Sequence, residues 1–246
     1  MPELNFEVMG VEPAQRGLAP LLQFKLRINT SPATETIQAL ILQAQIQIQS
    51  PQRAYNVGEK EKLVEVFGTP DRWGQTLRNQ FWAHANTTVG AFTRSVDAIL
   101  PVPCTFDLNV LATKYFQALE NADVPLLFLF SGSMFYATEG RLQVQRISWD
   151  KECAYRMPLH VWQELMDHHY PNTAWVSLRR DVFERLCAFK RTNGIATWEE
   201  TIERLMPALN NHVSSAGFSL SEEKFRVDTE QAKACTTNEQ HSEAAA

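Results

Sequence analysis

The sequence predicts an α+β protein, in which an antiparallel β-sandwich carries a helical insertion and a C-terminal three-helix segment. The first half of the chain holds several segments whose apolar and polar residues alternate, the period of a half-buried strand. From about residue 158 onward, apolar residues recur every three or four positions, the period of a helix. Turns rich in Pro, Asn, Thr and Ser separate the strand-like segments, which favours a sandwich, with an immunoglobulin-like topology as the working hypothesis.

The predicted strands begin at the N-terminus. Residues 4–8 and 24–28 alternate apolar with polar side chains. The clearest pattern is ALILQAQIQIQS at residues 39–50, where the even-numbered residues from Leu40 to Ile48 are apolar and most odd-numbered residues are Gln. Such a long two-residue period is typical of an antiparallel strand with one buried face.

A helical insertion is predicted at residues 59–85, where the strand period is lost. A first short helix ends at the Gly-Thr-Pro turn of residues 68–70. A second helix follows, in which Trp73, Leu77 and Phe81 are spaced at four-residue intervals and form one face.

The segment after the insertion returns to strand patterns. Pro101 and Pro103 place their segment at a sheet edge or at a crossover, because proline cannot donate to a central ladder. Residues 106–119 fit both a strand and a helix. We favour a strand there, since the segment that follows would pair naturally with it.

A central strand is predicted at residues 126–134, which are apolar on both faces. Gly132 inside this strand indicates a bulge or a close packing contact rather than a catalytic turn. The Glu139-Gly140 pair then forms a hairpin turn into the next strand.

Three helices are predicted after the last strand. Pro158 suits a first helical position, Gly194 closes the second helix, and Thr197 and Glu200 form a capping box for the third. The remaining chain is rich in Asn, Ser, Glu and Ala and predicts a disordered tail. We therefore divide the chain into a sandwich with its insertion, a helical segment packed on the sandwich, and the tail, at residues 1–150, 151–209 and 210–246.

Composition excludes several classes of protein. The chain has 246 residues, 44% of them apolar and 21% charged, which is a globular balance and not that of a disordered protein. The net charge of -5 argues against nucleic-acid binding, which relies on phosphate neutralisation. Apolar runs are too short for membrane insertion, and the first residues do not resemble a secretory signal, so we expect a cytoplasmic protein.

Motifs for catalysis or for cofactor binding are absent from the sequence. It contains no GxSxG, P-loop, GxGxxG or HExxH pattern, and its four scattered cysteines match no zinc template. We therefore expect no cofactor and favour a non-catalytic protein. The alternative is an enzyme or a metal-binding protein with a site at Asp167, His168 and His169. Adjacent histidines on a helix point about 100° apart, which argues against a shared metal.

Aromatic and arginine side chains predict a protein partner, because Trp and Arg are enriched at interaction hot spots. The candidate interface residues are Arg72, Trp73, Arg78, Trp82, His84, Trp149, Arg179 and Arg180. For Trp73 a core position is the competing interpretation. The Arg179-Arg180 pair can equally form salt bridges with Asp181 and Glu184 at the start of a helix.

Four stretches of this sequence resemble a known bacterial family: FGTPDRWGQTLRNQFWAH, LPVPCTFDLNVLATKYFQAL, PLLFLFSGSMF and the run from WDKECAYRMP to RLCAFK. The family is domain of unknown function 6084, and the resemblance covers roughly residues 4–207. It implies proximity to [NiFe]-hydrogenase genes, and hence an accessory role with a hydrogenase subunit or assembly factor as partner. The family offers no catalytic residues, and the lack of a CxxC pair argues against direct nickel or iron–sulfur handling. A sandwich that binds a small ligand remains a further alternative.

Overall fold

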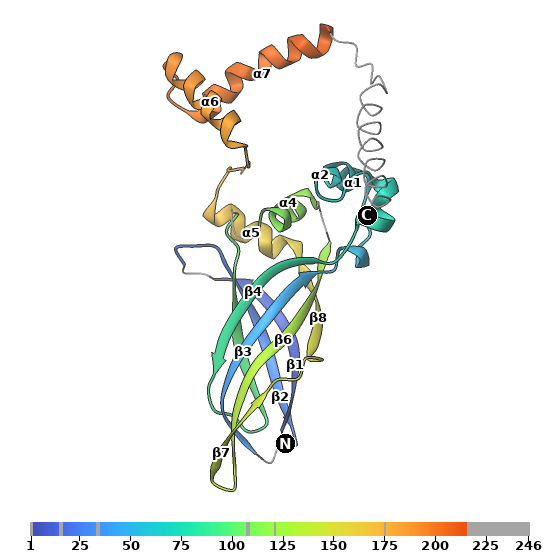
Figure 1. Cartoon of the computed structure of the whole chain (residues 1–246), viewed down its shortest axis with the longest axis vertical. Coiled ribbons are helices and arrows are strands. Elements are labelled where there is room, and N and C mark those ends of the chain that lie inside the picture. The colour runs from blue at the N-terminus through green and yellow to red at the C-terminus, as the bar shows by residue number, and fades with distance from the viewer. Residues whose placement is uncertain are drawn as a thin grey trace, which may run out of the picture. The chain divides into compact units, whose positions relative to one another are not determined.

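The structure of the chain is a computed structural model that describes residues 2–14, 17–32, 35–106, 109–120, 122–174 and 176–215 (Figure 1). The chain consists of two compact units, Met1–Trp175 and Val176–Ala246. We expected the first boundary after residue 150, but a strand and a helix that follow this point belong to the first unit. The predicted tail is helical up to Ser215, and its remainder, 216–246, lies outside the described residues.

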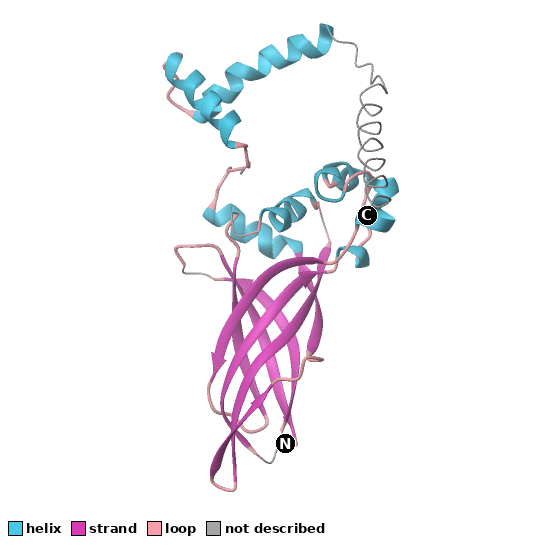
Figure 2. Cartoon of the chain, in the orientation of Figure 1, coloured by secondary structure: helices cyan, strands magenta, loops and turns pink. Residues whose placement is uncertain are grey.

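The first unit contains two antiparallel sheets (Figure 2). One has the order β1-β2-β5, with β1 (Glu3–Pro13), β2 (Leu21–Ser31) and β5 (Ser95–Pro103). The other has the order β4-β3-β6-β7, with β4 (Gln80–Val89), β3 (Thr36–Ile48), β6 (Asp123–Thr138) and β7 (Arg141–Arg146), while β8 (Glu152–Pro158) also pairs with β6. The sheet of β1, β2 and β5 faces the sheet of β4, β3 and β6. The same chain order is found in immunoglobulin-like sandwiches, where strands A, B and E face strands C′, C and F. The predicted α+β sandwich is confirmed.

The core lies between the two sheets. Phe24 of β2 packs with its ring centroid 5.1 Å from that of Phe128 on β6 and 6.2 Å from that of Trp82 on β4. The even-numbered side chains of β3 from Leu40 to Ile48 are fully buried, as the alternation in the sequence predicts. Their burial against the opposite sheet is the main source of hydrophobic stabilisation in this unit.

Helices gather at one end of the sandwich (Figure 1). Between β3 and β4 lie α1 (Val57–Lys62), α2 (Val64–Phe67) and α3 (Trp73–Thr76), with short 3-10 turns at Ser50–Gln52 and Pro70–Arg72. Helix α4 (Val110–Ala118) connects β5 to β6, and α5 (Leu159–His169) follows β8. Each of these connections leaves the strands at the same end, so this end of the core is covered by helices.

Two element predictions are wrong. The described residues of the range 106–119 contain α4 and no strand, because Asn109 caps the helix by accepting a 3.0 Å hydrogen bond from the backbone N–H of Ala112. The predicted second helix of the insertion ends early at Thr76, and residues from Gln80 onward form β4, which pairs along the length of β3. Tertiary pairing with β3 thus overrides the local helical spacing.

The sequence also did not predict β8, and Pro158 ends this strand and precedes α5 instead of being its first residue. Other predictions for the first unit agree with the structure. Strand β5, which carries both prolines, lies at the edge of its sheet. The Glu139-Gly140 turn joins β6 to β7, and Gly140 has a φ of 73°. None of the described helices has the length and apolar character needed to cross a bilayer.

The second unit consists of α6 (Arg180–Thr192) and α7 (Trp198–Ser215). The ring of Phe183 on α6 lies 5.4 Å from that of Trp198 on α7, and Lys190 donates to the Ala196 carbonyl at 2.7 Å. Together with α5, these elements confirm the three predicted C-terminal helices. The Thr197 hydroxyl accepts a hydrogen bond from the Glu200 backbone N–H, as the capping box predicts.

Candidate functional site

Trp149 is the most exposed aromatic side chain among the described residues. It lies in the segment between β7 and β8, and its relative exposure is 92%. Tryptophan has one of the largest apolar areas of any side chain, and almost all of this area at Trp149 remains in contact with water. The side chain is therefore available to a partner.

Hydrogen bonds hold the backbone on both sides of Trp149. The Ile147 N–H donates to the Gly132 carbonyl at 3.1 Å, and the Phe130 N–H donates to the Lys151 carbonyl at 2.8 Å. The Lys151 ammonium also forms an ion pair with Glu3 on β1, in the other sheet. Because these bonds hold the backbone of the segment before binding, less backbone entropy would be lost when a partner binds.

The position of this segment follows from a change of partner along β6. Strand β8 pairs with residues 123–129 of β6, whereas β7 pairs with residues 133–138. Gly132 lies at the change, has a φ of 138°, and approaches the Ile41 carbonyl so closely that a Cβ would lie 2.0 Å from its oxygen. This is the close contact that the sequence predicts for this glycine.

Strand β7, which leads to Trp149, also exposes apolar side chains. Leu142 and Val144 are 63% and 61% exposed. They pair with Ala137 and Phe135 of β6, so both lie on one face of the sheet. A strand with two exposed apolar side chains thus precedes the exposed tryptophan.

The insertion does not present its predicted interface as a whole. Trp73 and Trp82 are 9% and 4% exposed, so the prediction that they contact a partner is corrected to a core role. The indole N–H of Trp73 donates to the Gly68 carbonyl at 2.9 Å, which satisfies its one polar group. Arg72 and Arg78 are exposed, and their place in an interface stays a prediction.

His84 is exposed on β4, with its ring 4.8 Å from that of Phe81. Phe81 is itself 48% exposed. Sequence reasoning missed this exposed pair because it placed Phe81 on the buried face of a helix. Because residues three positions apart lie on opposite faces of a regular strand, the spacing of these two rings did not indicate that they are neighbours.

Arg179 and Arg180, at the start of the second unit, form the salt bridges of the competing interpretation. Arg179 pairs with Asp181 at 3.3 Å, and Arg180 pairs with Glu184 at 2.9 Å. All four side chains are largely exposed, so these pairs contribute little to stability and leave the arginines accessible.

The Asp167-His168-His169 triplet does not converge on one point. The two imidazole rings lie 5.1 Å apart at an interplanar angle of 87°. Asp167 lines a cavity between α4 and α5, whereas His168 lines a different cavity beside Glu12. Among the described residues, no cluster of three His, Cys, Asp or Glu side chains has the arrangement of a metal site.

Cysteine chemistry is also constrained. Cys104 is buried, and burial raises the pKa of its thiol to about 12, so the thiol stays protonated at neutral pH. Cys153 and Cys187 are free thiols that are partly buried. Cys235 lies outside the described residues.

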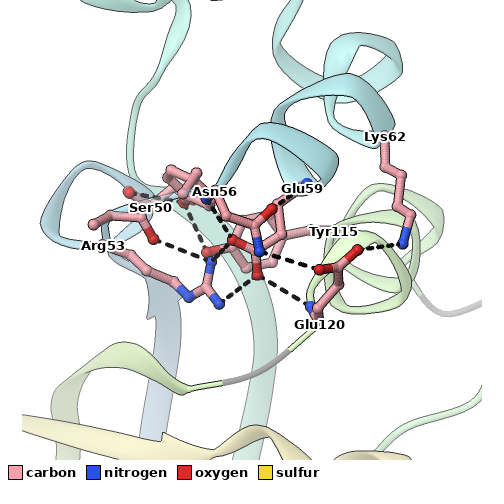
Figure 3. Close-up of polar contacts among 9 residues, drawn as sticks. Ser50, Arg53, Asn56, Glu59, Lys62, Tyr115 and Glu120 are labelled. Carbon is pink, nitrogen blue, oxygen red and sulfur yellow. Dashed lines mark hydrogen bonds and ion pairs between the residues drawn. The ribbon is translucent and has the colours of Figure 1, made fainter.

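A buried polar cluster, which sequence reasoning missed, joins the insertion to α4 (Figure 3). Arg53 donates two hydrogen bonds to the Glu59 carboxylate, at 2.7 and 3.0 Å, and the two side chains are 5% and 3% exposed. Glu59 also accepts the backbone N–H groups of Asn56 and Glu120. The Asn-x-x-Glu spacing of residues 56–59 was a readable sign of a helix cap, and the structure contains this capping box.

Two tyrosines extend this cluster. The hydroxyl oxygens of Tyr55 and Tyr115 lie 2.9 Å apart, and the Tyr55 hydroxyl donates to the Ser50 carbonyl. Burial raises the pKa of both phenols, so they remain neutral at physiological pH. The cluster pairs the buried Glu59 carboxylate with Arg53 and links the insertion to α4 and to the segment that follows it.

Acid should weaken this cluster. Burial alone raises the pKa of Glu59, but hydrogen bonds from Arg53 and from two backbone N–H groups outweigh burial and lower it below the ordinary value of 4.5. A carboxyl with a lowered pKa stabilises the folded state above its unfolded pKa and loses that contribution as pH falls through the folded value. We therefore expect wild type to lose more stability than Glu59→Gln when urea unfolding is measured at decreasing pH below about 4.5. Parallel curves for the two proteins would contradict this.

Comparison with known proteins gives one informative match. Residues 1–214 match the model of a family described as "Family of unknown function (DUF6084)". A comparison with curated proteins finds no match. A solved β-glucosidase from Kluyveromyces marxianus aligns over 63% of this chain and 15% of its own, with 5% sequence identity and a TM-score of 0.24, too low to support an argument. The family model covers most of the chain, and the protein therefore belongs to the DUF6084 family of unknown function.

Proposed function

We propose that this protein is a non-catalytic interaction module that binds a protein partner through Trp149. The observation that carries the proposal is a tryptophan with 92% exposure on a hydrogen-bonded segment. Interfaces concentrate binding energy in a few aromatic or arginine anchors, and preorganised anchors bind more tightly. Leu142 and Val144 on β7, the strand that leads to this segment, are further exposed apolar side chains.

The chemistry of the buried groups is consistent with this role. Glu59 is engaged with Arg53, and the Cys104 thiol is held protonated by burial. These groups serve the fold. The resemblance noted in the sequence makes a hydrogenase subunit or assembly factor the first partner to test, and a cytoplasmic setting is part of the same proposal.

Replacing Trp149 with Ala should abolish partner capture while leaving the fold intact. Loss of an anchor residue costs about 2 kcal/mol or more of binding free energy, which is roughly a 30-fold weaker Kd. Because the side chain is almost fully exposed, the free energy of unfolding should change by about 0.5 kcal/mol or less. The measurement is a quantitative pull-down of purified hydrogenase components and of host lysate with wild type and variant.

Leu18→Ala is the matched control, since Leu18 is also a fully exposed apolar residue. The proposal requires a partner that wild type and Leu18→Ala retain and that Trp149→Ala loses. Equal capture by all three proteins would remove Trp149 from the interface. If the protein captured in this pattern is not a hydrogenase component, the proposed interaction through Trp149 is supported and the proposed hydrogenase partner is rejected.

A further inference from the structure

A second feature, independent of Trp149, is the cavity between α4 and α5. Its volume is about 290 Å³, near the lower end of the range of small-molecule sites. The residues that line the cavity belong to the first unit and lie on or next to α4 and α5. Its walls come from two helices that approach each other through aromatic side chains.

Four aromatic rings contribute to the lining. The rings of Phe116 on α4 and Trp162 on α5 have centroids 5.0 Å apart, and those of Phe106 and Tyr170 have centroids 4.6 Å apart. Phe106, Phe116 and Trp162 are buried, so their positions are fixed by packing. Aromatic rings attract cations through their quadrupole, and a planar cation can stack against them.

The polar lining is suited to a cation that carries N–H groups. Asp167 is the single carboxyl side chain among the described residues that line the cavity, and the same lining includes the amides of Gln117 and Gln163. Asp167 is exposed, so its carboxylate can reach a ligand without rearrangement of the core. A carboxylate can accept two parallel N–H groups from a guanidinium, and amide oxygens can accept others.

We propose that this cavity binds a guanidinium group, with Asp167 as its counter-ion and the partly exposed ring of Tyr170 as its aromatic contact. The combination of aromatic lining, one carboxylate and two amides carries the inference. A guanidinium group can come from a free arginine-type metabolite or from an arginine side chain of a peptide. Both sources share the chemistry that the cavity would recognise.

The test is isothermal titration of the full chain with L-arginine, with L-lysine and with the blocked tripeptide acetyl-Gly-Arg-Gly-amide, in buffer containing EDTA. We expect saturable binding of at least one arginine ligand and a loss of at least about tenfold in affinity in Asp167→Asn, which removes a charge-assisted pair. The matched control is Asp71→Asn. Asp71 is also exposed but lies elsewhere, on the 3-10 turn Pro70–Arg72, so this variant should bind as wild type does.

Each outcome decides the inference. Binding of free arginine but not of the tripeptide assigns the site to a metabolite, and the reverse assigns it to a peptide. Failure of both ligands to bind, equal affinity of Asp167→Asn, or equal affinity for lysine would each overturn the proposal. Because Asp167 is exposed, its substitution should leave the melting temperature close to that of wild type, so lost binding would not reflect unfolding.

Discussion

Glu59→Gln is expected to destabilise the first unit by about 3 to 5 kcal/mol, the usual cost of leaving one partner of a buried ion pair without the other. The substitution removes the negative charge that Arg53 faces at 2.7 Å, while both side chains are almost fully buried. It also weakens the acceptor for the backbone N–H groups of Asn56 and Glu120. Urea unfolding followed by circular dichroism measures the effect.

Two controls separate the buried pair from a general charge effect. Glu65→Gln removes an exposed partner of Lys114 and should cost far less than Glu59→Gln. The double substitution Arg53→Met with Glu59→Gln should recover part of the loss, because it leaves no uncompensated charge and keeps a side-chain oxygen that can accept a backbone N–H. If Glu59→Gln unfolds within about 1 kcal/mol of wild type, the pair does not behave as a buried ion pair.

Gly132→Ala is expected to cost at least about 3 kcal/mol, since it adds both backbone strain and a steric clash. A Cβ at this position would lie 2.0 Å from the Ile41 carbonyl oxygen, and the φ of 138° is one that L-residues rarely adopt. The β3–β6 ladder would have to shift to accept the methyl group. Thermal unfolding measures the loss.

The control for this glycine is Gly90→Ala, where an added Cβ meets no atom within 4 Å. That variant should melt close to wild type. If Gly132→Ala has the same melting temperature as Gly90→Ala, β6 tolerates a side chain at the point where its pairing changes from β8 to β7. Because the Gly132 carbonyl accepts the Ile147 N–H, the proposed interaction role also predicts weaker partner capture by the destabilised variant.

Local sequence patterns correctly predicted the elements that bury one face and expose the other. The alternation from Leu40 to Ile48 predicted β3 because one side of that strand packs against the opposite sheet along its whole length. The same reasoning failed for residues 106–119, since alternating apolar residues also fit a short helix that is buried on several sides. There the Asn109 cap decides the structure, and it was visible in the sequence.

The candidate site was predictable only in part. Trp149 stood outside any apolar period, so its exposure could be anticipated from the sequence. Trp82 could not be placed, because its burial depends on β4 pairing with β3 and on Phe116 of α4 packing against it. The Arg53–Glu59 pair depends in the same way on the backbone of Glu120, which is distant in sequence.

The pairing of β3 with β6 has a consequence for how the chain folds during synthesis. These strands pair from Thr36 opposite Ala137 to Ile48 opposite Leu126, yet the insertion, β4, β5 and α4 all separate them in the chain. One edge of β3 therefore stays open until β6 has left the ribosome, even after β4 covers the other edge. An apolar strand with an open edge can pair with other nascent chains, and non-local pairing is slow. The interval between synthesis of β4 and of β6 is thus the stage at which this protein is most prone to aggregate.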